Sequence, residues 1–142
     1  MIFLEVLFSF FITVSFAILF NVRGKFIIYS GIGGAISWFV YLVLKEQGYT
    51  YPVCFLIATT ITAFYSEATA KLVGTTVPTL LIAALIPLAP GGGVYYTMLY
   101  LIQNKYHESL LKGIETSITA GSMALGIILV STCFRVFNYR KK

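Results

Sequence analysis

The chain is poor in charged residues and contains no aspartate. Charged side chains make up 11% of its 142 residues and hydrophobic side chains 58%, whereas a soluble domain carries about 25% and about 45–50% respectively. The mean hydropathy is +0.89. This composition excludes a water-soluble fold and a large soluble active site. A chain of this length has room for about four to six membrane-spanning helices of about 20 residues each.

The residue types that build hydrolytic and metal sites are also scarce. The one histidine, His107, stands in a polar segment with no second histidine or cysteine at ligand spacing. Cys54 and Cys133 lie in apolar runs without a CxxC spacing, which indicates neither metal ligands nor a disulfide. No GxSxG, HExxH or GxxxxGK(S/T) motif occurs. We therefore expect no enzyme activity, no catalytic residue, no metal and no cofactor.

Basic residues outnumber acidic ones, ten lysines and arginines against five glutamates, for a net charge of +5. They form no single stripe that would bind nucleic acid, and basic residues near the ends of spans are typical of multi-pass membrane proteins. With five spans, seven basic residues fall on one side and three on the other. The positive-inside rule then predicts an amino terminus outside and a cytoplasmic carboxyl terminus. The richer side holds Arg23, Lys25, Lys71, Arg135, Arg140, Lys141 and Lys142.

Hydropathy predicts a single all-α integral-membrane domain over residues 1–142, a polytopic membrane helix bundle of about five transmembrane helices. The first apolar stretch contains Glu5 and no positive charge, which favours a retained span over a cleaved signal peptide. Strand alternation and long repeats are missing, which excludes a barrel and a solenoid. The predicted spans cover residues 2–20, 26–44, 52–70, 78–103 and 114–134, with a polar loop over 104–113.

The fourth predicted span contains strong helix breakers. Its 26 positions would form a helix of about 39 Å, longer than the hydrocarbon core of about 30 Å. Pro87 and Pro90 each remove a backbone donor, and three consecutive glycines follow at 91–93. We therefore predict a break near 87–93. Since lipid does not satisfy freed backbone groups, the break must face protein or a wet cavity.

A broken helix in a membrane can bind a ligand through its exposed ends. The backbone amides at the start of the second half would bind a carboxylate, and freed carbonyls would accept from a cation or an ammonium group. The alternative is a proline kink that only helps the helices to pack. The predicted substrate-binding set is Pro87, Pro90, Gly91, Gly92, Gly93, Val94 and Tyr95.

Glu67, near the end of the third predicted span, is a candidate for proton or ion coupling. A carboxylate within or near a span is costly and is a functional hypothesis by default. The alternative is a surface ion pair with Lys71, one helical turn later. Glu5, Glu115, Lys105, Glu108 and Lys112 are expected to be solvated near the span ends.

Two spans are rich in hydroxyl groups, and two contain clusters of small residues. The hydroxyls would line a polar path or hydrogen-bond within their own helices, while the glycines would let helices touch. The hydroxyl residues are Thr59, Thr60, Thr62 and Ser66 in the third span and Thr116, Ser117, Thr119 and Ser122 in the last, and the glycines include Gly31, Gly33, Gly34, Gly121 and Gly126.

The broken segment resembles the threonine/serine exporter family. Residues Ile86–Met98 read IPLAPGGGVYYTM, with Pro78 before them and Gly113–Thr116 and Ala124–Ile127 after them. The resemblance covers nearly the whole chain and is greatest to the small membrane subunit of the YjjB type, which matches the carboxyl-terminal membrane half of the fused exporters. The family's Pro-Gly motif falls on Pro87, Pro90 and Gly91, and its acidic residue before the fourth segment falls on Glu67.

This resemblance implies an inner-membrane exporter of threonine and serine, driven by an ion gradient as an antiporter, with a larger membrane subunit of the YjjP type as its partner. A homo-oligomer is the alternative assembly. Two other functions stay open: a subunit that exports a small dicarboxylate such as succinate, and a non-catalytic scaffold for the larger partner. A passive channel is disfavoured, because the sequence has no ring of charge and no TVGYG-like filter.

Overall fold

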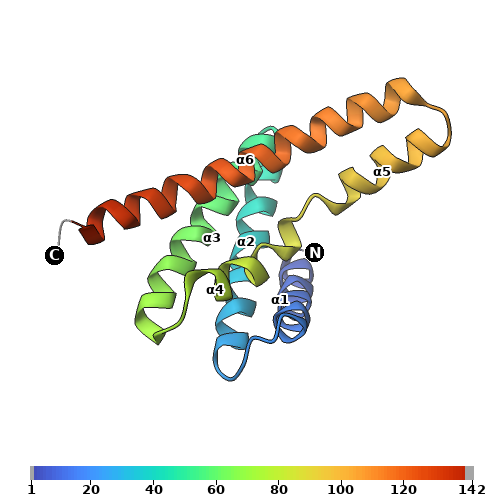
Figure 1. The fold of residues 1–142 in the computed structure, drawn as a ribbon. Helices are drawn as coiled ribbons and strands as arrows, with labels where there is room; N and C mark the ends of the chain where they lie inside the picture. The colour runs from blue at the N-terminus through green and yellow to red at the C-terminus, as the bar shows by residue number, and fades with distance from the viewer. Residues whose placement is uncertain (1, 140–142) are drawn as a thin grey trace.

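The computed structural model describes residues 2–139, and every regular element within this range is a helix, which confirms the predicted all-α fold (Figure 1). Met1 and the basic tail residues Arg140, Lys141 and Lys142 lie outside the described residues. The elements are α1 (Ile2–Leu19), α2 (Phe26–Glu46), α3 (Tyr51–Val73), α4 (Val77–Ala84), the 3-10 helix η1 (Ile86–Leu88), α5 (Gly91–Ile102) and α6 (Tyr106–Tyr139).

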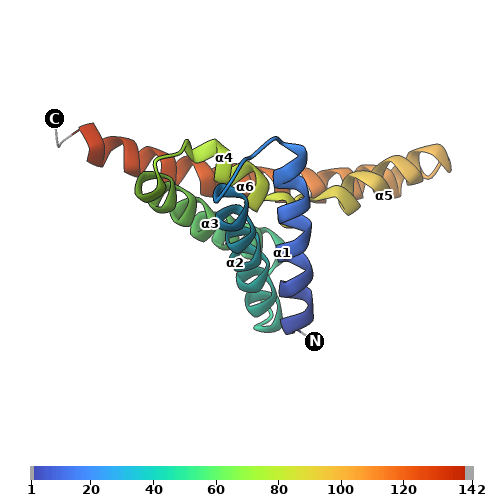
Figure 2. The ribbon, with the colours of Figure 1, turned by 90° about the horizontal axis from the view of Figure 1, so that it is seen from below.

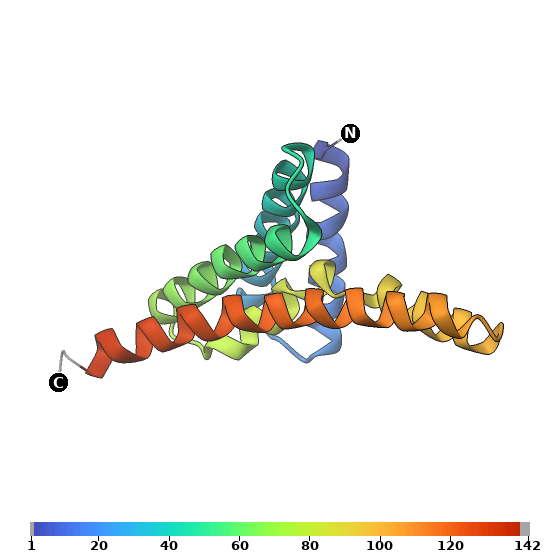
Figure 3. The same ribbon diagram turned by 90° about the horizontal axis from the view of Figure 1, so that it is seen from above.

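The first three helices form the body of the molecule, and α4 with η1 packs against it. Helix α2 packs against α1 on one side and α3 on the other, and α4 lies against both α2 and α3. Helix α6 runs across this body at a steep angle to α1, and it pairs with α5 in a hairpin that extends away from the other helices (Figures 2 and 3). The start of α1 and the last turn of α6 are well separated in these views.

Among residues 2–139, four helices are long and apolar enough to span a membrane, and the bent pair Val77–Leu88 and Gly91–Ile102 makes a fifth candidate. The structure corrects the last predicted span. Residues 106–113 form no loop, because α6 begins at Tyr106 and continues for 34 residues, about 51 Å at 1.5 Å per residue. Only the turn 103–105 separates α5 from α6, and Asn104 adopts a left-handed conformation there, with a φ of 57°.

Small residues bring the long helices into close contact at Gly31, Gly33, Gly34 and Gly126, as the sequence predicted, whereas Gly121 has open space around it. A Cβ atom at Gly34 in α2 would collide with Thr13 of α1, and the Ser9 hydroxyl of α1 donates to the Gly34 carbonyl at 2.9 Å. A Cβ atom at Gly126 in α6 would collide with the Thr59 hydroxyl of α3 and lie 2.9 Å from the Leu56 carbonyl oxygen. Glycine at these two positions therefore sets the α1–α2 and α3–α6 spacing.

Most hydroxyls in α3 bond within their own helix, one of the two roles that the sequence left open. Thr59 donates to the Phe55 carbonyl at 2.7 Å, and Thr62 donates to the Ala58 carbonyl at 2.8 Å. Because these donors are satisfied locally, they can be buried in an apolar interior at little cost. In α6, Thr116 and Thr119 likewise donate to carbonyls four residues earlier, but they also line a cleft.

Candidate substrate site

The predicted break is present, and it lies slightly earlier than the glycines. Helix α4 ends at Ala84, the 3-10 turn η1 follows, and α5 begins at Gly91 with a 53° bend between the two halves. Pro87 has no backbone N–H to continue the α-helical ladder, and Pro90 occupies the N-cap of α5. The three glycines form the first turn of α5 and do not themselves make the break.

Helix α2 compensates one backbone group at this break. The Ser37 hydroxyl lies 3.1 Å from the carbonyl oxygen of Ala84, the last residue of α4, and 2.8 Å from the Gly34 carbonyl. Ser37 is fully buried. A carbonyl left without its helical donor is costly in an apolar interior, so this side chain helps to hold the break against α2.

The first turn of α5 presents backbone amides at the break. The Gly91 N–H donates to the Ala89 carbonyl at 2.7 Å, and the Val94 N–H donates to the Pro90 carbonyl at 3.2 Å. Helix geometry gives Gly92 and Gly93 no intrahelical acceptor, since the residues four positions back precede α5. Together with the positive end of the helix dipole, these two amides favour an anionic group.

The beginning of α5 faces a cleft of about 260 Å³. Pro90 and Gly93 form one wall, α6 forms the second, and aromatic side chains of α2 and α3 form the third. We call it the α5–α6 cleft. Its lining consists of Tyr41, Tyr51, Phe55, Pro90, Gly93, Lys112, Glu115, Thr116 and Thr119.

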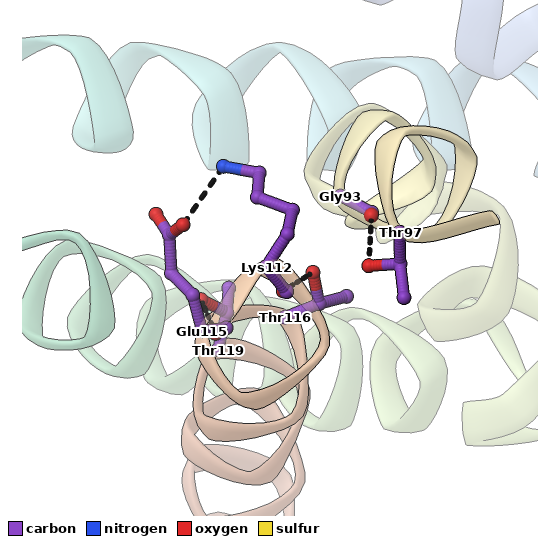
Figure 4. A network of polar contacts seen from close by, with 6 residues as sticks. All are labelled: Gly93, Thr97, Lys112, Glu115, Thr116 and Thr119. Atoms are coloured by element: carbon purple, nitrogen blue, oxygen red, sulfur yellow. Dashed lines mark hydrogen bonds and ion pairs between the residues drawn. The ribbon is translucent and has the colours of Figure 1, made fainter. Parts of the chain in front are cut away.

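An ion pair lies in the α6 wall of this cleft. The Lys112 Nζ atom lies 2.8 Å from Glu115 Oε2, and the two side chains are 34% and 51% exposed (Figure 4). An ion pair this accessible stabilises a fold by only about 0–1 kcal/mol. The pair therefore offers a cation and an anion that a charged ligand can recruit at small cost.

The glycine turn of α5 lies directly against α6. A Cβ atom at Gly93 would collide with the Thr116 hydroxyl, so only glycine permits this approach. The Gly93 carbonyl accepts from the Thr97 hydroxyl at 2.7 Å (Figure 4). About two turns earlier on α6, the Ser109 hydroxyl donates to the Thr97 carbonyl at 2.8 Å. These contacts fix the start of α5 beside Lys112 and Thr116.

Other members of the predicted site lie around the cleft or apart from it. Gly91 and Gly92 are exposed, with open space around each position for a Cβ atom. The side chains of Val94 and Tyr95 are 55% and 61% exposed and do not line the cleft. Pro87 lines a different cleft, on the α1 side of the break.

The family model described as Threonine/Serine exporter, ThrE, matches residues 5–133. The chain belongs to the threonine/serine exporter family. No curated protein and no solved structure matches it. Membership supports a transport role of the exporter type, and with the apolar helices it indicates a multi-pass membrane protein.

In this family member, Glu67 lies apart from the α5–α6 cleft. It is partly buried in the last turns of α3, about 18 Å along the helix axis from Phe55, which lines the cleft. Lys71 follows one turn later, with its Nζ atom 4.5 Å from the centre of the Phe134 ring of α6. The structure does not bring the two predicted parts of the exporter site together.

Sequence reasoning missed the charged wall of the site. Lys112 and Glu115 are 34% and 51% exposed, as expected near the end of a span. The sequence did not predict that they also line the cleft, together with Thr116 and Thr119. Positions 112, 115, 116 and 119 lie on one face of a helix. This spacing indicates a shared polar face only if residues 112–119 are known to be helical, which requires that α6 begin at Tyr106.

Proposed function

We propose that the chain is a membrane subunit of a secondary-active exporter of threonine and serine, driven by an ion gradient across the cytoplasmic membrane. The main structural support is the α5–α6 cleft, where the first turn of α5, with its free backbone amides, lies beside the Lys112–Glu115 ion pair. Family membership supports this proposal. So does the general use of discontinuous helices as binding sites in transporters.

The cleft has the right chemistry for an amino-acid zwitterion. The substrate carboxylate would bind the Gly92 and Gly93 amides and the Lys112 ammonium, and the substrate ammonium would bind the Glu115 carboxylate. The hydroxyls of Thr116 and Thr119 donate to their own helix and keep lone pairs that accept a hydrogen bond. A small hydroxylated side chain such as that of serine or threonine fits this arrangement.

The same charges disfavour a dicarboxylate such as succinate. Its second carboxylate would face Glu115 in a cleft that contains one cation and one anion, and like charges at close range repel. We therefore keep succinate as an alternative that the experiment tests. We rank it below the zwitterion.

For the coupling ion, we propose a role for Glu67. This carboxylate lies partly buried within a predicted span, where ionisable groups mark ion and proton pathways. Its distance from the α5–α6 cleft means that substrate and ion would act through separate sites. Coupling would then require a change in the packing of α3 against α6.

A partner is part of this proposal. Helix α5 has no buried residue, and within residues 2–139 it makes extensive contact only with α6. The hairpin of α5 and α6 therefore presents an apolar surface, which we assign to the larger membrane subunit of the YjjP type, to a second copy of this chain or to lipid. The proposed orientation in the membrane rests on the positive-inside rule, which puts the amino terminus outside and the carboxyl terminus in the cytoplasm.

The test is efflux of labelled serine, threonine and succinate from vesicles that contain this chain alone, and then from vesicles that also contain the larger subunit. Export of serine and threonine but not succinate supports the proposal. Export by the chain alone would assign the complete site to this chain, and export only with the partner would make it half of a transporter. Export of none of the three in either preparation would leave a scaffold role and contradict the proposal.

A further inference from the structure

A large open groove lies between α3 and α6. Its volume is about 600 Å³, and it shares no lining residue with the α5–α6 cleft or with the cleft beside Pro87. We call it the α3–α6 groove. Helix α3 contributes Thr60, Phe64 and Lys71 to its lining, and α6 contributes five side chains between positions 129 and 137.

The walls of this groove are mostly apolar and accessible from outside the molecule. The rings of Phe64 and Phe134 pack edge to face with their centres 5.4 Å apart, and Phe64 is 59% exposed. The Thr60 hydroxyl donates to the Leu56 carbonyl of its own helix at 2.7 Å, so it needs no donor or acceptor from a ligand. Lys71 is the one charged side chain of the lining. Such walls fit a hydrocarbon chain better than a hydrated ligand, whose polar groups would find few partners.

The groove has the length of one membrane leaflet. Thr60 and Lys71 are eleven positions apart on α3, about 17 Å along the axis, and half of the hydrocarbon core is about 15 Å. Thr60 lies near the middle of α3, and Lys71 lies in its last turn, where a candidate span ends. The groove therefore runs from the middle of the proposed span to its end.

The outer end of the groove is basic. The Lys71 Nζ atom lies 4.5 Å from the centre of the Phe134 ring, a cation–π contact that holds the ammonium over the α6 wall. Arg135, the next residue of α6, is exposed and adds a second cation to this end of the helix. Glu67 precedes Lys71 by one turn and does not line the groove. Basic pockets between membrane helices bind the headgroups of anionic lipids.

We propose that the α3–α6 groove binds one anionic phospholipid, with phosphatidylglycerol as the representative lipid. One acyl chain lies along the apolar walls toward Thr60, and the phosphate lies beside the Lys71 ammonium. Because an acyl chain is surrounded by hydrocarbon whether or not it is bound, the walls determine the fit. The charge at Lys71 then gives the preference for a negative headgroup over a zwitterionic one.

A lipid bound in this groove would contact both α3 and α6. These are the helices whose packing must change if Glu67 couples an ion to transport. This consequence for transport rests on the proposed function, whereas the lipid site itself does not.

The test is native mass spectrometry of the purified chain in neutral detergent, with phosphatidylglycerol against phosphatidylcholine of the same acyl chains. We expect the wild type to retain phosphatidylglycerol preferentially. Lys71→Gln should weaken phosphatidylglycerol binding about fivefold, the contribution of one basic group near a membrane surface, and Lys71→Arg should keep the preference. Lys25→Gln is the matched control, because the Lys25 Nζ atom also lies over a ring, 5.9 Å from the centre of Phe26, but lines no part of the groove.

A second pair of variants tests the groove itself. Cys133 is exposed and lines the α6 wall, so Cys133→Trp should fill part of the groove and weaken the binding of both lipids. Cys133→Ser changes the thiol without adding bulk and should bind both lipids as the wild type does. The thermal unfolding midpoint of each variant shows that it is folded.

Equal retention of the two lipids by the wild type would overturn the inference. So would a preference that survives in Lys71→Gln, an equal loss in Lys25→Gln, or phosphatidylglycerol binding that Cys133→Trp leaves unchanged. A lipid-free dimer that Cys133→Trp dissociates would assign the groove to a second copy of the chain and would also overturn it. Absence of serine export in a preparation that still retains phosphatidylglycerol through Lys71 would contradict the proposed function alone.

Discussion

The Ser37 hydroxyl of α2 donates a 3.1 Å hydrogen bond to the carbonyl of Ala84, where α4 ends. Ser37 is fully buried, and its second acceptor is the Gly34 carbonyl of its own helix. This contact joins the packing surface of α2 to the break. Its removal therefore tests how much this hydrogen bond stabilises the broken segment.

Replacing Ser37 by alanine should destabilise the protein by about 1–3 kcal/mol, because the buried Ala84 carbonyl would lose a donor. Thermal unfolding in detergent measures the change. The matched control is Ser15→Ala, whose exposed hydroxyl donates only to its own helix and whose loss should have little effect. An equal effect of both substitutions would show that the contact with Ala84 contributes nothing specific.

Replacing Gly93 by alanine should weaken both packing and substrate binding, because the added Cβ atom would collide with the Thr116 side chain. Overpacking of this kind costs about 1–3 kcal/mol. Gly92→Ala is the control, since nothing lies within 4 Å of a Cβ atom there. Adding Thr116→Ala to Gly93→Ala should restore stability. A stable Gly93→Ala variant would contradict the close approach of α5 and α6.

Neutralising Lys112 or Glu115 should abolish serine binding while leaving the fold intact. The pair is 34% and 51% exposed, so Lys112→Gln and Glu115→Gln should cost no more than about 1 kcal/mol of stability. Binding of labelled serine to purified protein measures the effect. Lys105→Gln, at the turn before α6, is the control. Serine binding that survives both substitutions would move the substrate site away from the α5–α6 cleft.

Replacing Glu67 by glutamine should abolish ion-driven export while the amount of protein in the membrane and its assembly stay normal. The substitution keeps the shape of the side chain and removes its charge. Efflux of labelled serine against its gradient is the measurement, with Glu46→Gln at the end of α2 as the control. Normal uphill export by Glu67→Gln would remove this carboxylate from the mechanism.

The fold and the break could be predicted from local chemistry. Long apolar runs define the first three helices, and Pro87, which comes after two turns of helix, cannot donate the backbone hydrogen bond that would continue them. The start of α6 was harder to predict from the sequence, because residues 106–113 are polar and resemble a loop by hydropathy alone. They are helical because the Asn104 turn brings them alongside α5, where Ser109 bonds to Thr97.

The candidate site, too, could be predicted from the sequence only in part. The amide-rich start of α5 follows from three glycines after a proline, and the sequence contains that information. The clefts do not, because each combines side chains from several helices. Tyr51 and Lys112 line one cleft only through the packing of α3 against α6, and the sequence gives no measure of that arrangement.

Helix α6 is an uninterrupted rod of 34 residues. Thr116 lines the α5–α6 cleft, and Phe134 packs against Phe64 of α3 with ring centres 5.4 Å apart. These two positions are about 27 Å apart along the axis, so a tilt of about 5° about one displaces the other by about 2 Å. If α6 moves as one rigid helix, we expect a ligand that fills the cleft to displace the part of α6 that packs beside Glu67 and Lys71 of α3.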